Sequence, residues 1–251
     1  MENNTDILEF YVEAGVDEAY NDAPFNFLSE GDKKPIVKAF EENFKVENDL
    51  ISISQIHKMA IDECEKISDF DSLLNKIKEF PHCPLKAKSI STILGKGNSV
   101  NPDVLILTEI PNVTEDKTGV AFCGDTGELL VRMLSAIGCS LDKNAFAMPV
   151  MFYRPAGGRI PTSEEMDTVK PFVFKAIELL KPKVILAMGG LVSSTILNIS
   201  DVIVSIRGKW YDYNGIPVMP TFSLQYIGGG VKEVRQKAWE DLQNVQKKLG
   251  L

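Results

Sequence analysis

Short apolar runs alternate with amphipathic stretches along the chain after residue 80. The apolar runs cover residues 104–109, 145–152 and 184–189, and residues 126–137 and 163–180 between them carry apolar side chains at helical spacing. This order is strand, helix, strand, helix, strand. Because consecutive parallel strands need a crossover connection, the pattern predicts a parallel sheet.

The last part of the chain predicts a hairpin, a further buried strand and a closing helix. Residues 202–222 are typical of a two-stranded ribbon that turns at Asn214-Gly215, a dipeptide favoured in tight hairpin turns, and leads into a last buried strand. Residues 231–248 have the apolar spacing of a helix that covers the sheet. The predicted fold class is α/β, with three layers (α/β/α) around a central, mainly parallel four-stranded sheet.

Helical spacing of apolar residues dominates residues 35–80, whereas residues 21–35 are rich in turn formers. We therefore predict an acidic arm over residues 1–30, a helical extension over residues 31–80 that packs on the core, and an α/β domain over residues 81–251.

Charge is unevenly distributed along the chain. The net charge is −8, but residues 1–50 hold 13 acidic and 4 basic side chains, which leaves 22 acidic and 23 basic side chains in the rest. A near-neutral body can carry a local basic face, so the net charge does not exclude a nucleic acid as the partner.

The chain carries no signal for a membrane or for secretion. With 44% hydrophobic residues it can bury a sizeable core, yet no stretch approaches the roughly 18 consecutive apolar residues of a membrane span. The first ten residues lack the basic start and apolar run of a signal peptide. We expect a soluble, cytoplasmic protein. Its four cysteines are widely spaced and form no C-x-x-C pair, so we expect buried thiols and no metal site.

The connection after the first predicted strand, residues 109–127, is the strongest candidate for an active-site loop. It is long and polar, and it holds Glu109, Glu115, Asp116 and the aromatic residue Phe122. In parallel sheets ligands bind at the carboxyl ends of the strands. The other loops after strands, residues 153–161, 189–191 and 222–230, should gather at the same edge and form a cleft with it.

The carboxylates Glu109, Glu115 and Asp116 are the candidate catalytic groups, able to orient a water molecule or to stabilise developing positive charge. The alternative for Glu115 and Asp116 is that they fix the conformation of the loop. Histidine chemistry is not expected in the cleft, because His57 and His82 both precede the sheet.

Two basic segments are candidates for binding phosphate. Arg154 and Arg159 flank a glycine-rich loop, and Arg207 and Lys209 lie on the predicted ribbon. Guanidinium groups grip phosphate oxygens with forked donors, although solvated surface arginines are the alternative. The glycine-rich pieces GKGNS, AMGGL and GGGVK match neither the phosphate loop nor the dinucleotide fingerprint, so we expect no nucleotide cofactor.

Residues 108–130 read TEIPNVTED and, two residues later, GVAFCGDTGELL. They resemble the G-E-[AG]-P-G-x-x-E-D and G-x-P-F-V-G-x-x-G-x-L-L motifs of the uracil-DNA glycosylase superfamily, most nearly the bacterial family-four type. The resemblance covers about residues 80–245. Further matching segments are Arg154-Pro155 with Gly157, Arg159, Pro161 and Thr162, then KPKVI at 181–185, Arg207-Gly208, and GIPVMPT at 215–221. The EAGVDEA segment near the amino terminus is similar to arms on bacterial members.

The resemblance implies a role in DNA repair. It implies that Phe122 stacks on an extruded base, that Ile110 and Ser223 line the base site, and that Glu109 positions the attacking water. It also implies that Arg154, Arg159, Arg207 and Lys209 hold DNA phosphates. Extrusion is required because the glycosidic carbon is inaccessible in a stacked duplex.

The chain departs from the family at chemically important positions. Pro149 stands where the family has an asparagine that reads uracil, and Ser223 stands where it has a histidine. The four cysteines that hold an iron-sulfur cluster in the family fall at Phe80, Cys83, Tyr153 and Val169, which leaves a single thiol. We expect no cluster and no other cofactor.

Three hypotheses follow, and the sequence leaves open whether the protein is an enzyme. The first is a metal-independent glycosylase that hydrolyses the N-glycosidic bond of uracil or another deaminated base in DNA. The second is a catalytically impaired homologue that binds DNA or a repair partner through the same face. The third keeps only the doubly wound sheet and an unknown small ligand, since a fold alone does not determine a function.

Overall fold

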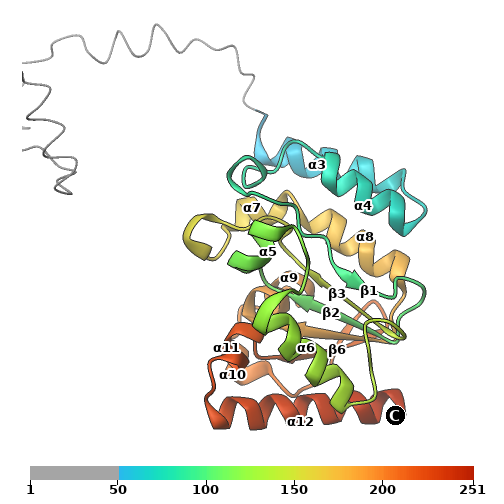
Figure 1. The fold of residues 1–251 in the computed structure, drawn as a ribbon. Helices are drawn as coiled ribbons and strands as arrows, with labels where there is room; N and C mark the ends of the chain where they lie inside the picture. The colour runs from blue at the N-terminus through green and yellow to red at the C-terminus, as the bar shows by residue number, and fades with distance from the viewer. Residues whose placement is uncertain (1–50) are drawn as a thin grey trace, which may run out of the picture. The chain divides into compact units, whose positions relative to one another are not determined.

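The computed structural model describes residues 51–251 (Figure 1). The predicted acidic arm and the first part of the predicted helical extension, up to residue 50, lie outside the described residues. Within residues 51–251, no helix is both long enough and apolar enough to cross a membrane.

A six-stranded sheet runs through the centre of the described unit, in the order β1-β3-β2-β4-β6-β5. The four inner strands are parallel and comprise β3 (Ala145–Pro149), β2 (Val104–Thr108), β4 (Val184–Met188) and β6 (Ile216–Thr221). The predicted parallel four-stranded core is therefore confirmed. Two short antiparallel edge strands, β1 (Lys96–Gly97) and β5 (Tyr211–Tyr213), extend it.

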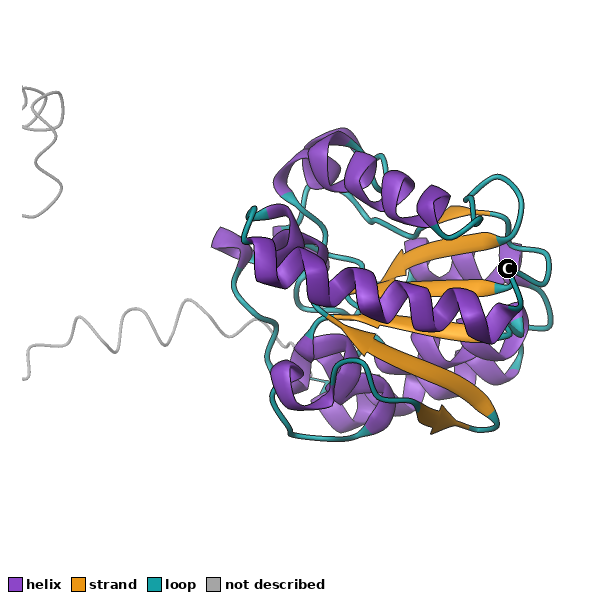
Figure 2. Ribbon diagram, turned by 90° about the horizontal axis from the view of Figure 1, so that it is seen from below, coloured by secondary structure: helices purple, strands orange, loops and turns teal. Residues whose placement is uncertain are grey.

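Helices cover both faces of this sheet, as the predicted three-layer architecture requires (Figure 2). Every residue of β2, β3 and β4 is buried, which explains why these strands are unbroken apolar runs. Successive side chains of a strand point to opposite faces. Leu105 and Leu107 accordingly join one hydrophobic cluster, and Val104 and Ile106 join the other.

The helices of the structure are α3 (Ile53–Glu65), α4 (Phe70–Glu79), α5 (Val113–Thr118), α6 (Gly124–Ala136), α7 (Ser163–Asp167), α8 (Lys170–Leu180), α9 (Gly190–Leu197), α10 (Ile203–Ile206), α11 (Leu224–Gly228) and α12 (Lys232–Leu249). The helix predicted over residues 163–180 is divided in two. Pro171 lies in the first turn of α8, where its missing N–H costs nothing, but it would break a helix that ran through it.

The hairpin turn is confirmed at Asn214-Gly215, where both residues have positive φ angles of 51° and 85°. The ribbon around it differs from the prediction. Residues 203–206 form the short helix α10, and β6 is both the second strand of the hairpin and the last buried strand.

Helices α3 and α4 pack on α8 and share its hydrophobic cluster. Ile56 and Ala60 contribute the buried face of α3, and Leu73 and Ile77 that of α4. Residues 51–80, the described part of the predicted helical extension, therefore share one hydrophobic core with the sheet.

Candidate functional site

Three segments meet in a cavity at the carboxyl end of β2. The end of β2, the α5–α6 region and the start of α11 contribute its lining residues: Thr108, Glu109, Ile110, Asn112, Glu115, Phe122, Thr126, Ser223, Leu224 and Gln225. We call this cavity the edge pocket. It brings together five of the residues selected from the sequence: Glu109, Ile110, Glu115, Phe122 and Ser223.

The edge pocket is small. Its volume is ≈ 30 Å³, which is room for about two water molecules. A nucleobase is several times larger than a water molecule and enters only when lining side chains move aside. Leu224 and Gln225 are two of those lining side chains, and both belong to the short helix α11.

Glu109 follows β2 directly and reaches the start of α9. Its Oε1 accepts a hydrogen bond from the backbone amide of Leu191 at 3.1 Å. Burial raises the pKa of this carboxyl, and hydrogen bonds from the amides of Leu191 and Gly190 oppose the rise. Gly189 makes the approach possible, because a Cβ there would lie 2.3 Å from Cδ of Glu109.

Phe122 is held in the left-handed backbone region, with φ at 53°. This conformation is rare for a bulky residue and persists only where the surroundings enforce it. The carboxylate of Glu115 supplies the constraint, because it accepts hydrogen bonds from the amides of Phe122 and Asn112, both at 2.6 Å. Burial raises the pKa of Glu115.

Gly127 completes the support for Phe122. A Cβ on Gly127 would lie 1.9 Å from the carbonyl oxygen of Phe122, so no larger residue fits without moving the loop. The recurrent glycine in this motif therefore has a steric cause. Phe122 itself is buried, with 8% of its surface exposed.

Asp116 does not line the edge pocket. Its Oδ1 accepts hydrogen bonds from Oγ of Ser89 at 2.7 Å and from the amides of Ile90 and Ser91 at 3.0 and 3.1 Å. The structure thus gives both Glu115 and Asp116 partners within the loops, which is the structural alternative to a catalytic role. Helix α5, whose capping box joins Asn112 and Glu115, was not predicted from the sequence.

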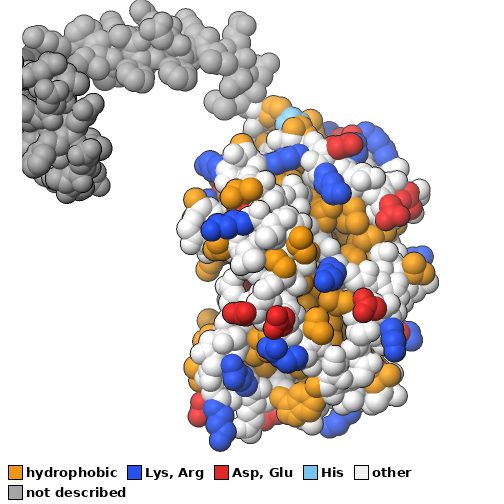
Figure 3. Space-filling model, viewed as in Figure 1, with side chains coloured by type: hydrophobic (Ala, Val, Ile, Leu, Met, Phe, Trp, Pro, Cys, Tyr) orange, Lys and Arg blue, Asp and Glu red, His pale blue; other side chains and the backbone are white. Residues whose placement is uncertain are grey.

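Arg154 and Arg159 lie on the predicted loop but have protein partners. Arg154 donates from Nη1 to the carbonyl of Pro111 at 2.6 Å. Arg159 forms a bidentate pair with Glu165, at 2.8 and 2.6 Å, while its side chain stays 46% exposed. Basic and acidic side chains are interspersed over the face drawn in Figure 3, which shows no single basic stripe.

Arg207 is an internal residue rather than a free surface cation. Its guanidinium pairs with Asp241, which is completely buried, and donates to the carbonyl of Lys237 at 2.7 Å. Thr221 also donates to Asp241, at 2.6 Å. These bonds attach the end of β6 to α12. Lys209, by contrast, is exposed. Asp241 was not among the residues selected from the sequence, although a carboxylate on the apolar face of the closing helix indicates a buried polar contact.

The sequence of the chain matches a known protein family. The model of the uracil DNA glycosylase superfamily matches residues 94–243. The chain is 30% identical to the type-4 uracil-DNA glycosylase of Thermotoga maritima over 174 residues, which are 68% of this chain and 90% of that protein. The chain belongs to the uracil-DNA glycosylase superfamily.

Two further relatives differ in length. The type-4 uracil-DNA glycosylase of Pyrobaculum aerophilum is 29% identical over 147 residues, which are 57% of this chain and 74% of that protein. A DNA polymerase of Bacillus phage SP01 is 28% identical over 149 residues, 59% of this chain but only 15% of the polymerase. The matching region thus occurs both in glycosylases and within a much longer replication protein.

The two substituted superfamily positions have structural roles in this member. Pro149 is the buried last residue of β3, in register with Thr108 of β2. Ser223 caps α11, because its Oγ accepts from the amide of Tyr226 at 3.3 Å. Neither side chain supplies the amide or the imidazole of the superfamily motif.

The cluster positions of the superfamily do not fit an iron-sulfur cluster here. Phe80, Cys83, Tyr153 and Val169 are all buried, and they supply one thiol. Burial raises the pKa of Cys83, which opposes formation of a thiolate. Tyr153 donates from its hydroxyl to the carbonyl of Ile77 at 3.1 Å. These four positions therefore contribute buried side chains to the core, and only one of them has a sulfur atom that could bind iron.

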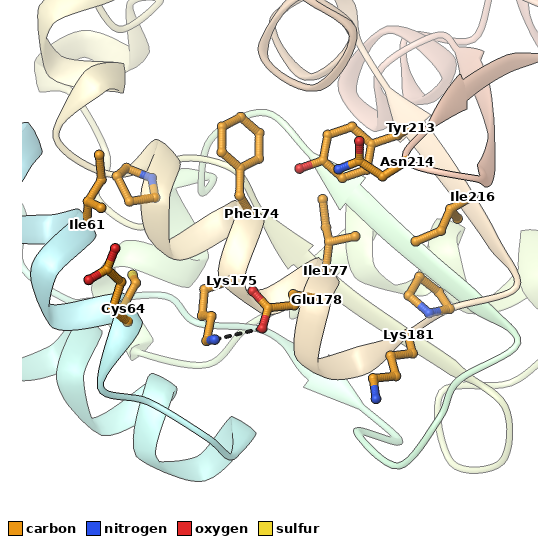
Figure 4. A pocket seen from close by; sticks show the side chains of 13 residues that line it. Ile61, Cys64, Phe174, Lys175, Ile177, Glu178, Lys181, Tyr213, Asn214 and Ile216 are labelled. Carbon is orange, nitrogen blue, oxygen red and sulfur yellow. Dashed lines mark hydrogen bonds and ion pairs between the residues drawn. The ribbon is translucent and has the colours of Figure 1, made fainter.

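A larger cavity, ≈ 600 Å³ in volume, lies near the start of β6, at the opposite end of that strand from the edge pocket (Figure 4). Phe174 stacks on Tyr213 in its wall, with ring centroids 5.9 Å apart. Lys175 and Glu178 pair with each other at 2.8 Å. None of the superfamily motif residues of the edge pocket lines it, so size alone does not identify the functional site.

Replacing Glu115 with Gln tests the support for Phe122. One amide oxygen takes the place of two carboxylate oxygens, so either the Phe122 or the Asn112 amide loses its acceptor. We expect the free energy of unfolding to fall by about 1–3 kcal/mol, the cost of a buried unsatisfied donor. Urea denaturation measures it. Glu128→Gln is the matched control, because Glu128 is an exposed side chain of α6. Equal effects of the two substitutions on the free energy of unfolding would contradict the role of Glu115.

Proposed function

We propose that this protein acts on DNA as a glycosylase that hydrolyses the N-glycosidic bond of uracil or another deaminated base. One observation carries the proposal. Glu109 and Phe122, which come from different segments, line the same pocket at the carboxyl end of β2. Membership of the superfamily supports DNA as the partner.

The chemistry needs a base outside the duplex and a water molecule beside its glycosidic carbon. Phe122 stacks on the extruded base, with Ile110 and Ser223 beside it. Glu109 orients the water and accepts its proton, and it stabilises positive charge that develops on the sugar as the base leaves. Backbone amides at the start of α9 hold one carboxylate oxygen in place before the substrate arrives.

The remaining candidate residues take supporting roles. Glu115 and Asp116 position Phe122 and the neighbouring loop rather than contacting the substrate. Arg154, Arg159 and Lys209 bind DNA phosphates in this proposal. Arg207 acts through its pair with Asp241, which fixes the end of β6 beside the edge pocket.

The changes at Pro149 and Ser223 predict a slow enzyme with altered base selection. Loss of one stabilising donor typically lowers the rate by about a hundredfold or more, and two losses compound. Pro149 has no side-chain amide and cannot form hydrogen bonds with the edge of uracil. The preferred base therefore need not be uracil.

A second candidate function is DNA binding without excision. Two observations favour it: the edge pocket has a volume of only ≈ 30 Å³, and a related region lies within a phage DNA polymerase. Single-turnover incubation with uracil- and hypoxanthine-containing oligonucleotides separates the two functions. Binding with no base release above the Glu109→Ala level would exclude the glycosylase and retain the binding protein.

Glu109→Gln should lower base release by about a hundredfold to ten-thousandfold, because the amide cannot accept the proton of the water. In the unchanged protein, activity requires the ionised carboxylate and falls as the pH drops through its pKa. Burial raises that pKa, so the acidic limb should lie above the ordinary glutamate value. A pH–rate profile measures this. A profile without an acidic limb, or equal rates for the two proteins, would exclude Glu109 as the base.

Ser223→His should raise the rate of uracil release by about tenfold, because it restores a donor for the charge on the departing base. Ser223→Ala is the control, since both substitutions remove the helix cap but only one adds an imidazole. Single-turnover kinetics compare them. Equal rates for the two variants would mean that position 223 does not face the reacting base.

A further inference from the structure

A second cavity adjoins the edge pocket on the side of α6 and α12. Its volume is ≈ 330 Å³, and its lining includes Asp125 and Arg132 from α6 and Arg235 from α12. Thr126 and Gln225 line both cavities. The two cavities therefore share a wall, and a ligand in one lies next to a ligand in the other.

The second cavity places two guanidinium groups from different helices around one space. Arg132 is 67% exposed, and its partner is the exposed Glu128 at 3.5 Å. Such surface pairs contribute little and exchange readily for a better ligand. Arg235 donates from Nε to the carbonyl of Ile227 at 3.3 Å, which uses one of its five N–H groups. Both residues keep donors for an anion.

We propose that this cavity binds a backbone phosphate of the DNA strand whose base occupies the edge pocket. The inference rests on the proposed action on DNA and adds a binding site that the sequence motifs did not identify. Guanidinium forks match phosphate oxygens in geometry and charge. A phosphodiester is connected to its base through one sugar, so adjacent cavities with a shared wall suit the two parts of one nucleotide strand.

Replacing Asp125 should change the affinity for DNA in the direction opposite to replacing the arginines. This exposed carboxylate lines the same cavity as the arginines and repels a phosphate there. Asp125→Asn keeps the size of the side chain and removes the charge. A phosphate site predicts tighter DNA binding for Asp125→Asn and weaker binding when the arginines are removed. A purely structural role for these exposed residues predicts neither change.

The experiment compares four forms of the full chain: unchanged, Arg132→Ala/Arg235→Ala, Asp125→Asn, and the control Lys58→Ala/Lys78→Ala. The control removes two exposed positive charges from α3 and α4. Fluorescence anisotropy with a short uracil-containing duplex gives the affinity at several salt concentrations. We expect the arginine variant to bind about tenfold more weakly and its salt slope to fall by about 1, since the loss of one phosphate contact lowers the slope by about 1.

The outcomes separate this inference from the proposed function. If the unchanged protein binds DNA and the arginine variant matches the lysine control in affinity and slope, the phosphate site is excluded while the proposed function stands. Weaker binding by Asp125→Asn would also exclude it. If the unchanged protein binds no DNA, both the phosphate site and the proposed function fail. Thermal unfolding checks that the four forms are equally folded.

Discussion

The site depends on one buried carboxylate that bonds two backbone amides. Glu115 accepts from the amides of Asn112 and Phe122, and so connects the residue that caps α5 to a residue two positions before α6. Without this hydrogen bond, nothing would hold the Phe122 amide in the left-handed backbone region, which a bulky residue normally avoids. Phe122 would then no longer be held in the wall of the edge pocket that it shares with Glu109. The backbone conformation at Phe122 is thus determined by the carboxylate of a residue seven positions earlier in the chain.

The scaffold of the superfamily is retained in this protein, while several groups within it have been exchanged. Ser223, at the position of the histidine in the family motif, caps α11. Tyr153, at the position of a cluster cysteine in the family, contributes an aromatic ring and a hydrogen bond to the carbonyl of Ile77. In both places the substituted residue satisfies a structural need. The fold therefore does not require a histidine at position 223 or a cysteine at position 153, because the parallel strands and the Glu115 connection do not depend on those groups.

The strands and the main helices were predictable, because buried strands are apolar runs and covering helices show apolar spacing. Helix α5 was not, because its polar residues follow no apolar period and its start is defined by the Asn112–Glu115 capping box. The role of Arg207 was also missed. Its partner Asp241 lies 34 residues away, and only the packing of α12 on the sheet brings them together. Side-chain types and motif spacing selected Glu109 and Phe122 in the connection between β2 and α6, but the size of the pocket that they line required coordinates.

A crystal structure of the protein with duplex DNA that carries an uncleavable deoxyuridine analogue would show whether an extruded base enters the edge pocket. We expect the analogue to be extruded, its base to lie on the ring of Phe122, and the carboxylate of Glu109 to face the sugar carbon that bears the base. Leu224 or Gln225 should have moved to enlarge the edge pocket. A complex in which the base remains stacked in the duplex, or in which DNA contacts a face away from the carboxyl end of β2, would contradict the account.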